Sequence, residues 1–301
     1  MLVHSLVFAV IAMMTVLIFS ESFRRSLSIW FFESKNRLSL LPTIILLFYS
    51  VITVQNGTWQ FREFLLLGIY FSLPVFIFWR RAGRHSAASL LDVVLVLLVW
   101  FPQEFELVAV DWASLNKLPV PVGVFVTVIF LLILLTNRQS IELHCPGSMR
   151  MTDLAAMGIA YVALLAIIVP IGTIVNFIAL GLNHRFFDNP FDLIFLFFAI
   201  FLAVALPEEL LFRGWIQNLL MTRLKFLPGL LTAAVIFGLS HLDNKVETST
   251  HTFNMPNWWY AFFATFAGLA YGFVYQKRKS LFTSALLHTV VDFTWVIFFA
   301  G

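Results

Sequence analysis

Long apolar runs separated by short polar connections dominate the chain. A helix needs about 20 apolar residues to cross a bilayer. The pattern yields ten candidate spans: 2–20, 40–55, 62–79, 88–101, 120–136, 154–180, 191–211, 228–242, 257–276 and 281–300. Three of them (40–55, 88–101 and 228–242) are short for a bilayer, which favours tilted or partly re-entrant segments. The sequence therefore predicts an all-α, polytopic membrane helix bundle of about 8–10 transmembrane helices.

Composition supports this class and excludes others. The 301 residues are 60% hydrophobic and 12% charged, whereas soluble domains are about 45–50% apolar and about 25% charged. A soluble enzyme or a disordered chain is therefore excluded. The single cysteine, Cys145, cannot form an internal disulfide. Basic residues exceed acidic ones only by 19 to 16, so we expect the lipid bilayer, and no nucleic acid, as a partner.

The positions of the basic residues predict an orientation. Fifteen of the 19 Lys and Arg residues fall in alternate connections, and the other four are Arg62, Lys117, Arg185 and Lys245. Connections rich in Lys and Arg face the cytoplasm. We therefore expect an integral, multi-pass protein of the bacterial cell (inner) membrane with both termini outside. Residues 137–153 predict a boundary between a membrane-spanning region of unassigned role, 1–150, and a core, 151–301.

Ionisable side chains gather in the last third of the chain. Charge inside hydrocarbon is costly, so an intramembrane ionisable residue is a functional hypothesis by default. Six such residues lie within or beside the last four apolar segments: Glu208, Glu209, Arg213, His241, His288 and Asp292. The first half of the chain has almost none well inside a span. Counted along their helices, Glu208 and His241 both lie about 20 Å from the inner end, so these residues can share one site.

The spacing of these residues divides their roles. Glu209 and Arg213 are four apart, share a helix face and can neutralise each other. Glu208 is rotated by about 100° and faces elsewhere. His288 and Asp292 are also four apart, an arrangement in which a carboxylate can fix the tautomer of an imidazole.

Two chemistries suit one carboxylate beside two imidazoles. In a pocket that excludes water, Glu208 could act as a general base that activates a water molecule, with His241 and His288 assisting. The same three residues, Glu208, His241 and His288, could instead hold a divalent metal such as zinc, because two His and one Glu form a known zinc set. The residues themselves do not choose between these mechanisms.

Three motifs, in this order, carry a resemblance to a known family. They are Glu208-Glu209-x-x-x-Arg213, Phe237-x-x-x-His241 and His288-x-x-x-Asp292. Together they resemble the CAAX-protease and bacteriocin-processing (CPBP) family of intramembrane glutamic endopeptidases, which is related to the eukaryotic CAAX prenyl endopeptidase and is also called the abortive-infection family. The resemblance covers roughly residues 190–300.

The resemblance implies an intramembrane endopeptidase without a cofactor, although the family has also been described as metal-dependent. Glu208 would activate water, His241 would support it, and His288 with residue 292 would form the oxyanion side. Glu209, Arg213 and Phe237 would be supporting residues. Many members have Asn where this chain has Asp292, and an ionised Asp cannot donate a hydrogen bond. The substrate would be a protein or peptide with a transmembrane or lipidated C-terminal tail.

Two other functions use the same residues. Buried Glu, His and Asp side chains also build the proton relays of membrane transporters, but the chain shows no pseudo-symmetry between its halves of the kind many transporters have. A catalytically inactive membrane scaffold is the other alternative. Taken singly, Glu209 with Arg213 could be a helix-stabilising pair and His241 a packing residue.

Overall fold

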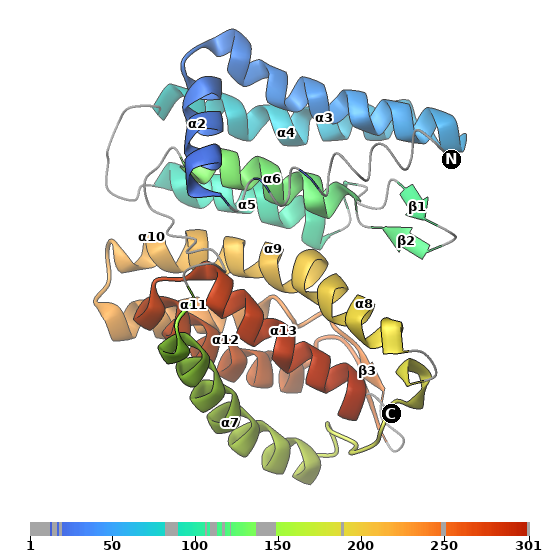
Figure 1. Cartoon of the computed structure of the whole chain (residues 1–301), viewed down its shortest axis with the longest axis vertical. Helices are drawn as coiled ribbons and strands as arrows, with labels where there is room; N and C mark the ends of the chain where they lie inside the picture. Colours follow the sequence, from blue (N-terminus) through green and yellow to red (C-terminus); the bar gives the residue numbers. More distant parts are fainter. Residues whose placement is uncertain are drawn as a thin grey trace. The chain divides into compact units, whose positions relative to one another are not determined.

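The computed structural model describes residues 20–81, 90–105, 107–108, 113–115, 118–120, 122–136, 149–187, 190–247 and 251–299, together with Met13 and Leu17. The chain divides into two compact units, Met1–Ile141 and Glu142–Gly301 (Figure 1). Residues 137–148 of the predicted boundary, 137–153, and most of the first predicted span, 2–20, lie outside the described residues.

The first unit is a helical bundle with one small hairpin. Its helices are α2 (Glu21–Phe32), α3 (Lys35–Asn56), α4 (Phe61–Arg81), α5 (Leu90–Glu104) and α6 (Val122–Thr136), and strands β1 (Ala113–Leu115) and β2 (Leu118–Val120) pair antiparallel. Ser28 donates to the Ile133 carbonyl (2.8 Å) and so joins α2 to α6, while Tyr70 donates to Val99 (2.9 Å) and joins α4 to α5. Gly57 ends α3 in the left-handed conformation that glycine adopts readily.

The second unit is also helical. It contains α7 (Met151–Ile174), the 3₁₀ turn η2 (His184–Phe186), a long helix over 190–221, α11 (Phe226–Leu239), α12 (Trp258–Arg278) and α13 (Leu281–Phe298). A short hairpin of β3 (Val246–Glu247) and β4 (Thr252–Phe253) lies between α11 and α12. The predicted segment 154–180 ends as a helix at Ile174, and α11 ends at Leu239, so that His241 lies in the turn beyond it.

The long helix of the second unit alternates between α and π geometry. It consists of α8 (Pro190–Ile200), the π-helical η3 (Phe201–Ala205), α9 (Leu206–Glu209), the π-helical η4 (Leu210–Gln217) and α10 (Asn218–Met221). Pro207 has no N–H group and cannot continue the regular hydrogen-bond pattern, which accounts for the widened turn that precedes it. Wide turns of this kind are frequent at functional sites, and these two flank the Glu208–Glu209 pair.

Small residues let α11 and α12 approach closely. A methyl group added at Gly268 would lie 3.2 Å from the backbone of Ala234, and one added at Gly238 would lie 2.5 Å from the carbonyl of Ala261. Such approaches are typical of membrane helices, in which contact between small residues replaces hydrophobic association. The backbones of α11 and α12 are therefore in close contact at these glycines, which leaves α12 little freedom to shift or rotate against α11.

Five described helices are long and apolar enough to cross a membrane: Asn36–Asn56, Phe61–Trp79, Met151–Ile174, Phe191–Met221 and Leu281–Phe298. Two shorter apolar helices cover Leu91–Gln103 and Phe226–Leu239, where the sequence predicts short segments. The predicted all-α membrane bundle is confirmed. Helix α12 (Trp258–Arg278), at the predicted span 257–276, is as long, with 21 residues, but is not among these five.

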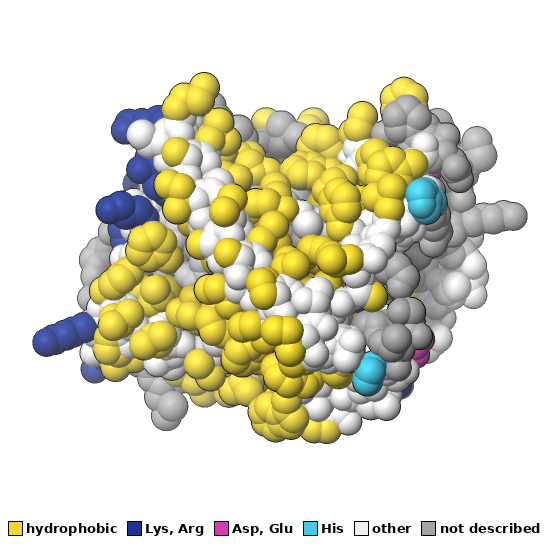
Figure 2. Space-filling model, turned by 90° about the horizontal axis from the view of Figure 1, so that it is seen from below, with side chains coloured by type: hydrophobic (Ala, Val, Ile, Leu, Met, Phe, Trp, Pro, Cys, Tyr) yellow, Lys and Arg dark blue, Asp and Glu magenta, His cyan; other side chains and the backbone are white. Residues whose placement is uncertain are grey.

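Basic side chains lie at one end of the second unit. They are at the start of α7, in the turn between α10 and α11, and at the end of α12: Arg150, Arg223, Lys225, Lys277, Arg278 and Lys279. An ion pair between Arg278 and Asp153 joins two of these helix ends. Figure 2 shows one face of the molecule, with hydrophobic side chains across its middle and Lys and Arg gathered at one edge. This distribution is typical of a bilayer-embedded surface.

The close packing of α11 against α12 yields a stability prediction. In Gly238→Ala the new methyl group meets the Ala261 carbonyl and the Thr265 hydroxyl, and overpacking of this kind costs about 1–3 kcal/mol. We expect a lower unfolding temperature of the detergent-solubilised protein. Gly158→Ala in α7 is the matched control, because nothing lies within 4 Å of its added methyl group. An equal effect of both substitutions would contradict the packing described here.

Candidate active site

A fully buried carboxylate, Glu209, lies at the centre of the polar cluster in the second unit. Arg213, also fully buried, donates to it from the next helical turn, through Nε at 3.0 Å and Nη2 at 3.4 Å. Ser284 on α13 donates through Oγ at 2.6 Å, and His288 on the same helix donates through Nδ1 at 3.2 Å. The predicted Glu209–Arg213 pair is therefore present, and it also joins the long helix to α13.

Glu208 faces away from this network, as its rotation along the helix predicts. Its side chain is 31% exposed, and its Oε2 atom lies 3.9 Å from Nε2 of His288 and 4.0 Å from Nε2 of His241. Three elements thus bring one carboxylate and two imidazoles together: α9, the turn after α11, and α13. These distances exceed direct hydrogen bonds. The Oε2 atom itself is buried, whereas the side chain as a whole is partly exposed.

The backbone sets the tautomer of His241. Its Nδ1 lies 2.9 Å from the carbonyl oxygen of Phe237, and because a carbonyl only accepts, Nδ1 must carry the proton. Ser240 is 3.1 Å from the same nitrogen and donates to the same carbonyl. In the neutral ring Nε2 is consequently an acceptor, and it faces the carboxylate of Glu208.

His288 lies between carboxylates at both of its ring nitrogens. Nδ1 donates to Glu209, and Nε2 is 3.3 Å from Oδ2 of Asp292. A neutral ring would turn the Nε2 lone pair toward the Asp292 oxygen, so this contact requires a proton on one of the two groups. In this geometry Asp292 therefore pairs with His288 through a shared proton.

Aromatic rings surround the charged groups. Phe237 lies 4.8 Å from the His241 ring and 5.8 Å from the His288 ring, measured between centroids. The guanidinium of Arg213 lies over the Phe237 ring at 4.7 Å and over the Tyr271 ring at 5.8 Å. These are cation–π distances, which stabilise a buried cation. Phe237, predicted as a supporting residue, thus contacts all three motifs.

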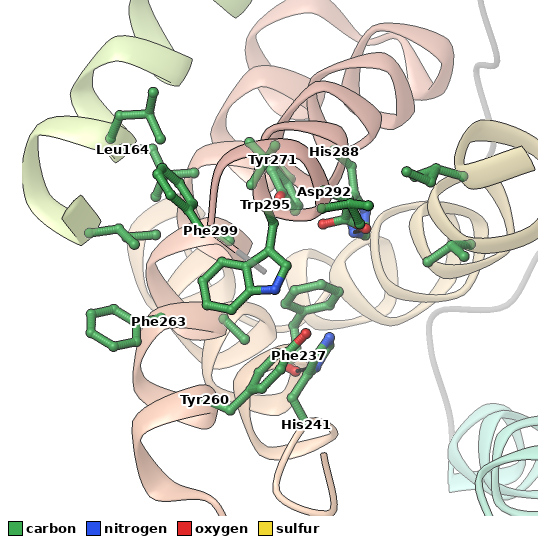
Figure 3. Close-up of a pocket in the computed structure, with 18 of the residues that line it drawn as sticks. Leu164, Phe237, His241, Tyr260, Phe263, Tyr271, His288, Asp292, Trp295 and Phe299 are labelled. Carbon is green, nitrogen blue, oxygen red and sulfur yellow. Dashed lines mark hydrogen bonds and ion pairs between the residues drawn. The ribbon is translucent and has the colours of Figure 1, made fainter. Parts of the chain in front are cut away.

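A mostly apolar cavity of about 270 Å³ adjoins the site within the second unit. His241, His288 and Asp292 lie in its wall with Tyr260, Tyr271 and Trp295, and Leu164 of α7 and Phe263 of α12 contribute to its apolar part (Figure 3). A small polar group in an apolar pocket is the usual form of a binding site for an organic substrate.

The site geometry also bears on a metal. In the described ranges no group of three or more His, Cys, Asp or Glu side chains is arranged to hold a metal ion. Two ligands of one tetrahedral zinc ion lie roughly 3.4 Å apart, whereas Glu208 Oε2 is 3.9 and 4.0 Å from the two imidazole nitrogens. As placed, the three side chains are spaced more widely than the ligands of one zinc ion.

Sequence reasoning missed several residues of the site. Ser284 is one turn before His288 on α13. It could have been found, because it is a polar residue on the same face of an apolar helix as His288 and Asp292. Tyr260 and Tyr271 lie eleven residues apart on α12 and contact the imidazoles of the site. No motif spacing pointed to them, because α12 contributes none of the motif residues.

One comparison with known proteins gives a match. Residues 190–294 match the family model described as type II CAAX prenyl endopeptidase Rce1-like. The matched segment is about a third of the chain and contains all seven predicted site residues, so the predicted family resemblance is confirmed over this segment. No curated protein and no solved structure matches the chain.

The buried pair can be tested against an exposed one of the same spacing. Glu21 and Arg25 also lie four residues apart, at 3.1 Å, but their side chains are 70% and 65% exposed. Removing one partner of a buried pair costs about 3–5 kcal/mol, whereas surface pairs contribute little. We expect Arg213→Gln to lower the unfolding temperature strongly and Arg25→Gln to leave it nearly unchanged. Equal shifts in a thermal unfolding assay would argue against a central role for the buried pair.

Proposed function

We propose that this protein is an intramembrane endopeptidase in which Glu208 activates the water molecule that hydrolyses a peptide bond. The observation that carries the proposal is the approach of two imidazole Nε2 atoms to one Glu208 oxygen, at 3.9 and 4.0 Å, beside an apolar cavity. The family match over residues 190–294, described as a CAAX prenyl endopeptidase, supports the same reaction class.

The first step is proton transfer from water. A water molecule that reaches the partly exposed Glu208 carboxylate and His241 Nε2 would donate one hydrogen bond to each acceptor. Glu208 removes a proton as the water oxygen attacks the scissile carbonyl carbon, and it then delivers that proton to the leaving amine nitrogen. General base and acid catalysis of this kind contributes typically 10²–10⁴-fold in rate.

We propose that His288 stabilises the negative charge that develops on the carbonyl oxygen. With protons on both nitrogens, its ring donates to Glu209 through Nδ1 and offers Nε2–H toward the cavity. Asp292, 3.3 Å from Nε2, would then keep the ring charged until substrate arrives. This assigns Asp292 a supporting electrostatic role in place of direct donation to the oxyanion.

The substrate we propose is a protein or peptide whose C-terminal tail or transmembrane segment reaches the site from the bilayer. Glu208 is thirteen residues, about 20 Å, from the basic end of its helix at Met221. We place this basic end in the cytoplasm of a bacterial cell, with both chain termini outside. Apolar walls suit a lipidated or hydrophobic tail.

Glu208→Gln tests the proposal directly. The amide has the same shape but cannot take the proton from water, so we expect hydrolysis of an internally quenched, farnesylated CAAX peptide in proteoliposomes to fall at least about 100-fold. Glu247→Gln, an exposed position on β3, is the matched control and should leave the rate unchanged. Unfolding temperatures of both variants should stay near that of the wild type.

The alternatives give different outcomes in the same experiment. A Glu208→Gln variant that cleaves at the wild-type rate would end the proposed role of Glu208. Proton uptake into the proteoliposomes that depends on Glu208, without cleavage of peptide, would indicate a proton-coupled transporter. Absence of both activities in the wild type, with all motif residues in place, would indicate a membrane scaffold.

Metal removal separates glutamate catalysis from zinc catalysis. We expect the purified enzyme to keep its rate after treatment with 1,10-phenanthroline or EDTA and to contain less than a stoichiometric amount of zinc by elemental analysis. Loss of activity on chelation, restored by added zinc, would instead assign Glu208, His241 and His288 as metal ligands.

A further inference from the structure

Two tyrosines of α12 stack face to face on the two imidazoles of the site. The ring of Tyr260 lies 5.2 Å from that of His241 with an interplanar angle of 25°, and Tyr271 lies 4.5 Å from His288 at 21°. Figure 3 shows both tyrosines beside the cavity. The motif residues come from other elements, so α12 supplies a second and separate set of contacts to the same two rings.

The spacing of the tyrosines matches the position of the imidazoles. Eleven residues are three helical turns, so Tyr260 and Tyr271 share one face of α12 about 16 Å apart. Between them the rings of His241, Phe237 and His288 follow in sequence, at 4.8 and 5.8 Å between neighbouring centroids. The two tyrosines thus belong to a cluster of five rings, in which Phe237 also lies 6.0 Å from Tyr271.

Hydrogen bonds alone do not restrain the ring faces of the two imidazoles. Nδ1 of His241 is bound to Phe237, and Nδ1 of His288 to Glu209, which fixes the direction of one N–H group. The His241 ring can still tilt about that bond, and the tilt would move its Nε2 away from Glu208. The His288 ring is also held at Nε2, by the 3.3 Å contact with Asp292, but its two faces are not fixed by hydrogen bonds. A flat aromatic ring against the imidazole face blocks this tilt, and its position is fixed because α12 is held at backbone distance from α11.

We infer that Tyr260 and Tyr271 are positioning residues, which hold the ring planes so that Nε2 of His241 stays directed at Glu208 and Nε2 of His288 at Asp292 and the cavity. The effect belongs to the aromatic ring, since stacking needs no hydroxyl group. This inference rests on the proposed hydrolysis for its effect on rate, but its effect on the imidazole rings does not depend on any activity.

The rings can be observed directly. In proteoliposomes containing ¹³C,¹⁵N-histidine-labelled protein, the C–H order parameters of the two imidazoles report ring motion. Variants His241→Gln and His288→Gln assign their signals among the seven histidines of the chain. We expect Tyr260→Leu to lower the order parameter of His241 alone and Tyr271→Leu that of His288 alone, whereas the corresponding Phe variants change neither.

The third tyrosine of α12, Tyr275, controls for the loss of a buried aromatic ring. Tyr275 is buried and bonded to Asn218 through its hydroxyl, at 2.8 Å, so Tyr275→Leu should leave the order parameters of both site imidazoles unchanged. If a Leu variant does not fold, as judged by its unfolding temperature, the Met variant of the same position replaces it, because Met is closer in length and also lacks a ring.

Kinetics complete the test, with the farnesylated CAAX peptide as the probe. We expect each of Tyr260→Leu and Tyr271→Leu to lower kcat about tenfold or more with KM changed less than about twofold, and each Phe variant to restore kcat. A tyrosine that only lines the cavity would change KM and leave kcat unchanged, which would overturn the inference. Unchanged order parameters in both Leu variants would overturn it as well.

Failure of the inference and failure of the proposed function are distinguishable. If the wild type cleaves the probe and Glu208→Gln does not, while both Leu variants match the wild type in kcat and ring order, only the inference fails. If no protein cleaves the probe but the order parameters fall as expected, the positioning role stands and the proposed hydrolysis of this probe fails.

Discussion

The second unit depends on the compensation of one fully buried carboxylate. An ionised group in a low-dielectric interior costs several kcal/mol unless it is paired and hydrogen-bonded. Glu209 meets this requirement with Arg213 on its own helix and with Ser284 and His288 on α13. Because the partners come from two helices, the need to satisfy the charge fixes how these helices lie against each other, and with them the ring of His288.

From this constraint follows a division of labour between two adjacent glutamates. The carboxylate of Glu209 is fully engaged in hydrogen bonds and an ion pair that hold the helices together. Glu208, the next residue on the helix, faces His241 and His288 instead. α12 adds one stacked aromatic ring to each imidazole. Its close approach to α11, through Gly238 and Gly268, keeps these rings in place. The ion pair of Glu209, the close packing of α11 against α12 and the tyrosine stacking therefore all help to orient the imidazoles of His241 and His288.

Much of the site could be predicted from sequence because its residues are rare in an apolar background. Glu208, Glu209, Arg213 and the two histidines stand out as charge within spans, and their i, i+4 spacing identifies shared helix faces. Ser284 and the tyrosines of α12 could not be found in this way, since Ser and Tyr are ordinary in membrane helices. Their role depends on which helices are neighbours. The exact helix ends could not be predicted from the sequence either. The π-helical turns around Pro207 and the end of α11 at Leu239 arise from local backbone geometry.

The most direct test of the account compares peptide termini in cells. Membranes from a strain with the wild-type chain and from one with Glu208→Gln would be analysed by mass spectrometry for new C-termini. If Glu208 catalyses hydrolysis, a set of cleaved products will be present only with the wild type, and the corresponding uncleaved precursors will accumulate in the Glu208→Gln strain. Identical termini in both strains, at equal protein levels, would contradict hydrolysis by Glu208.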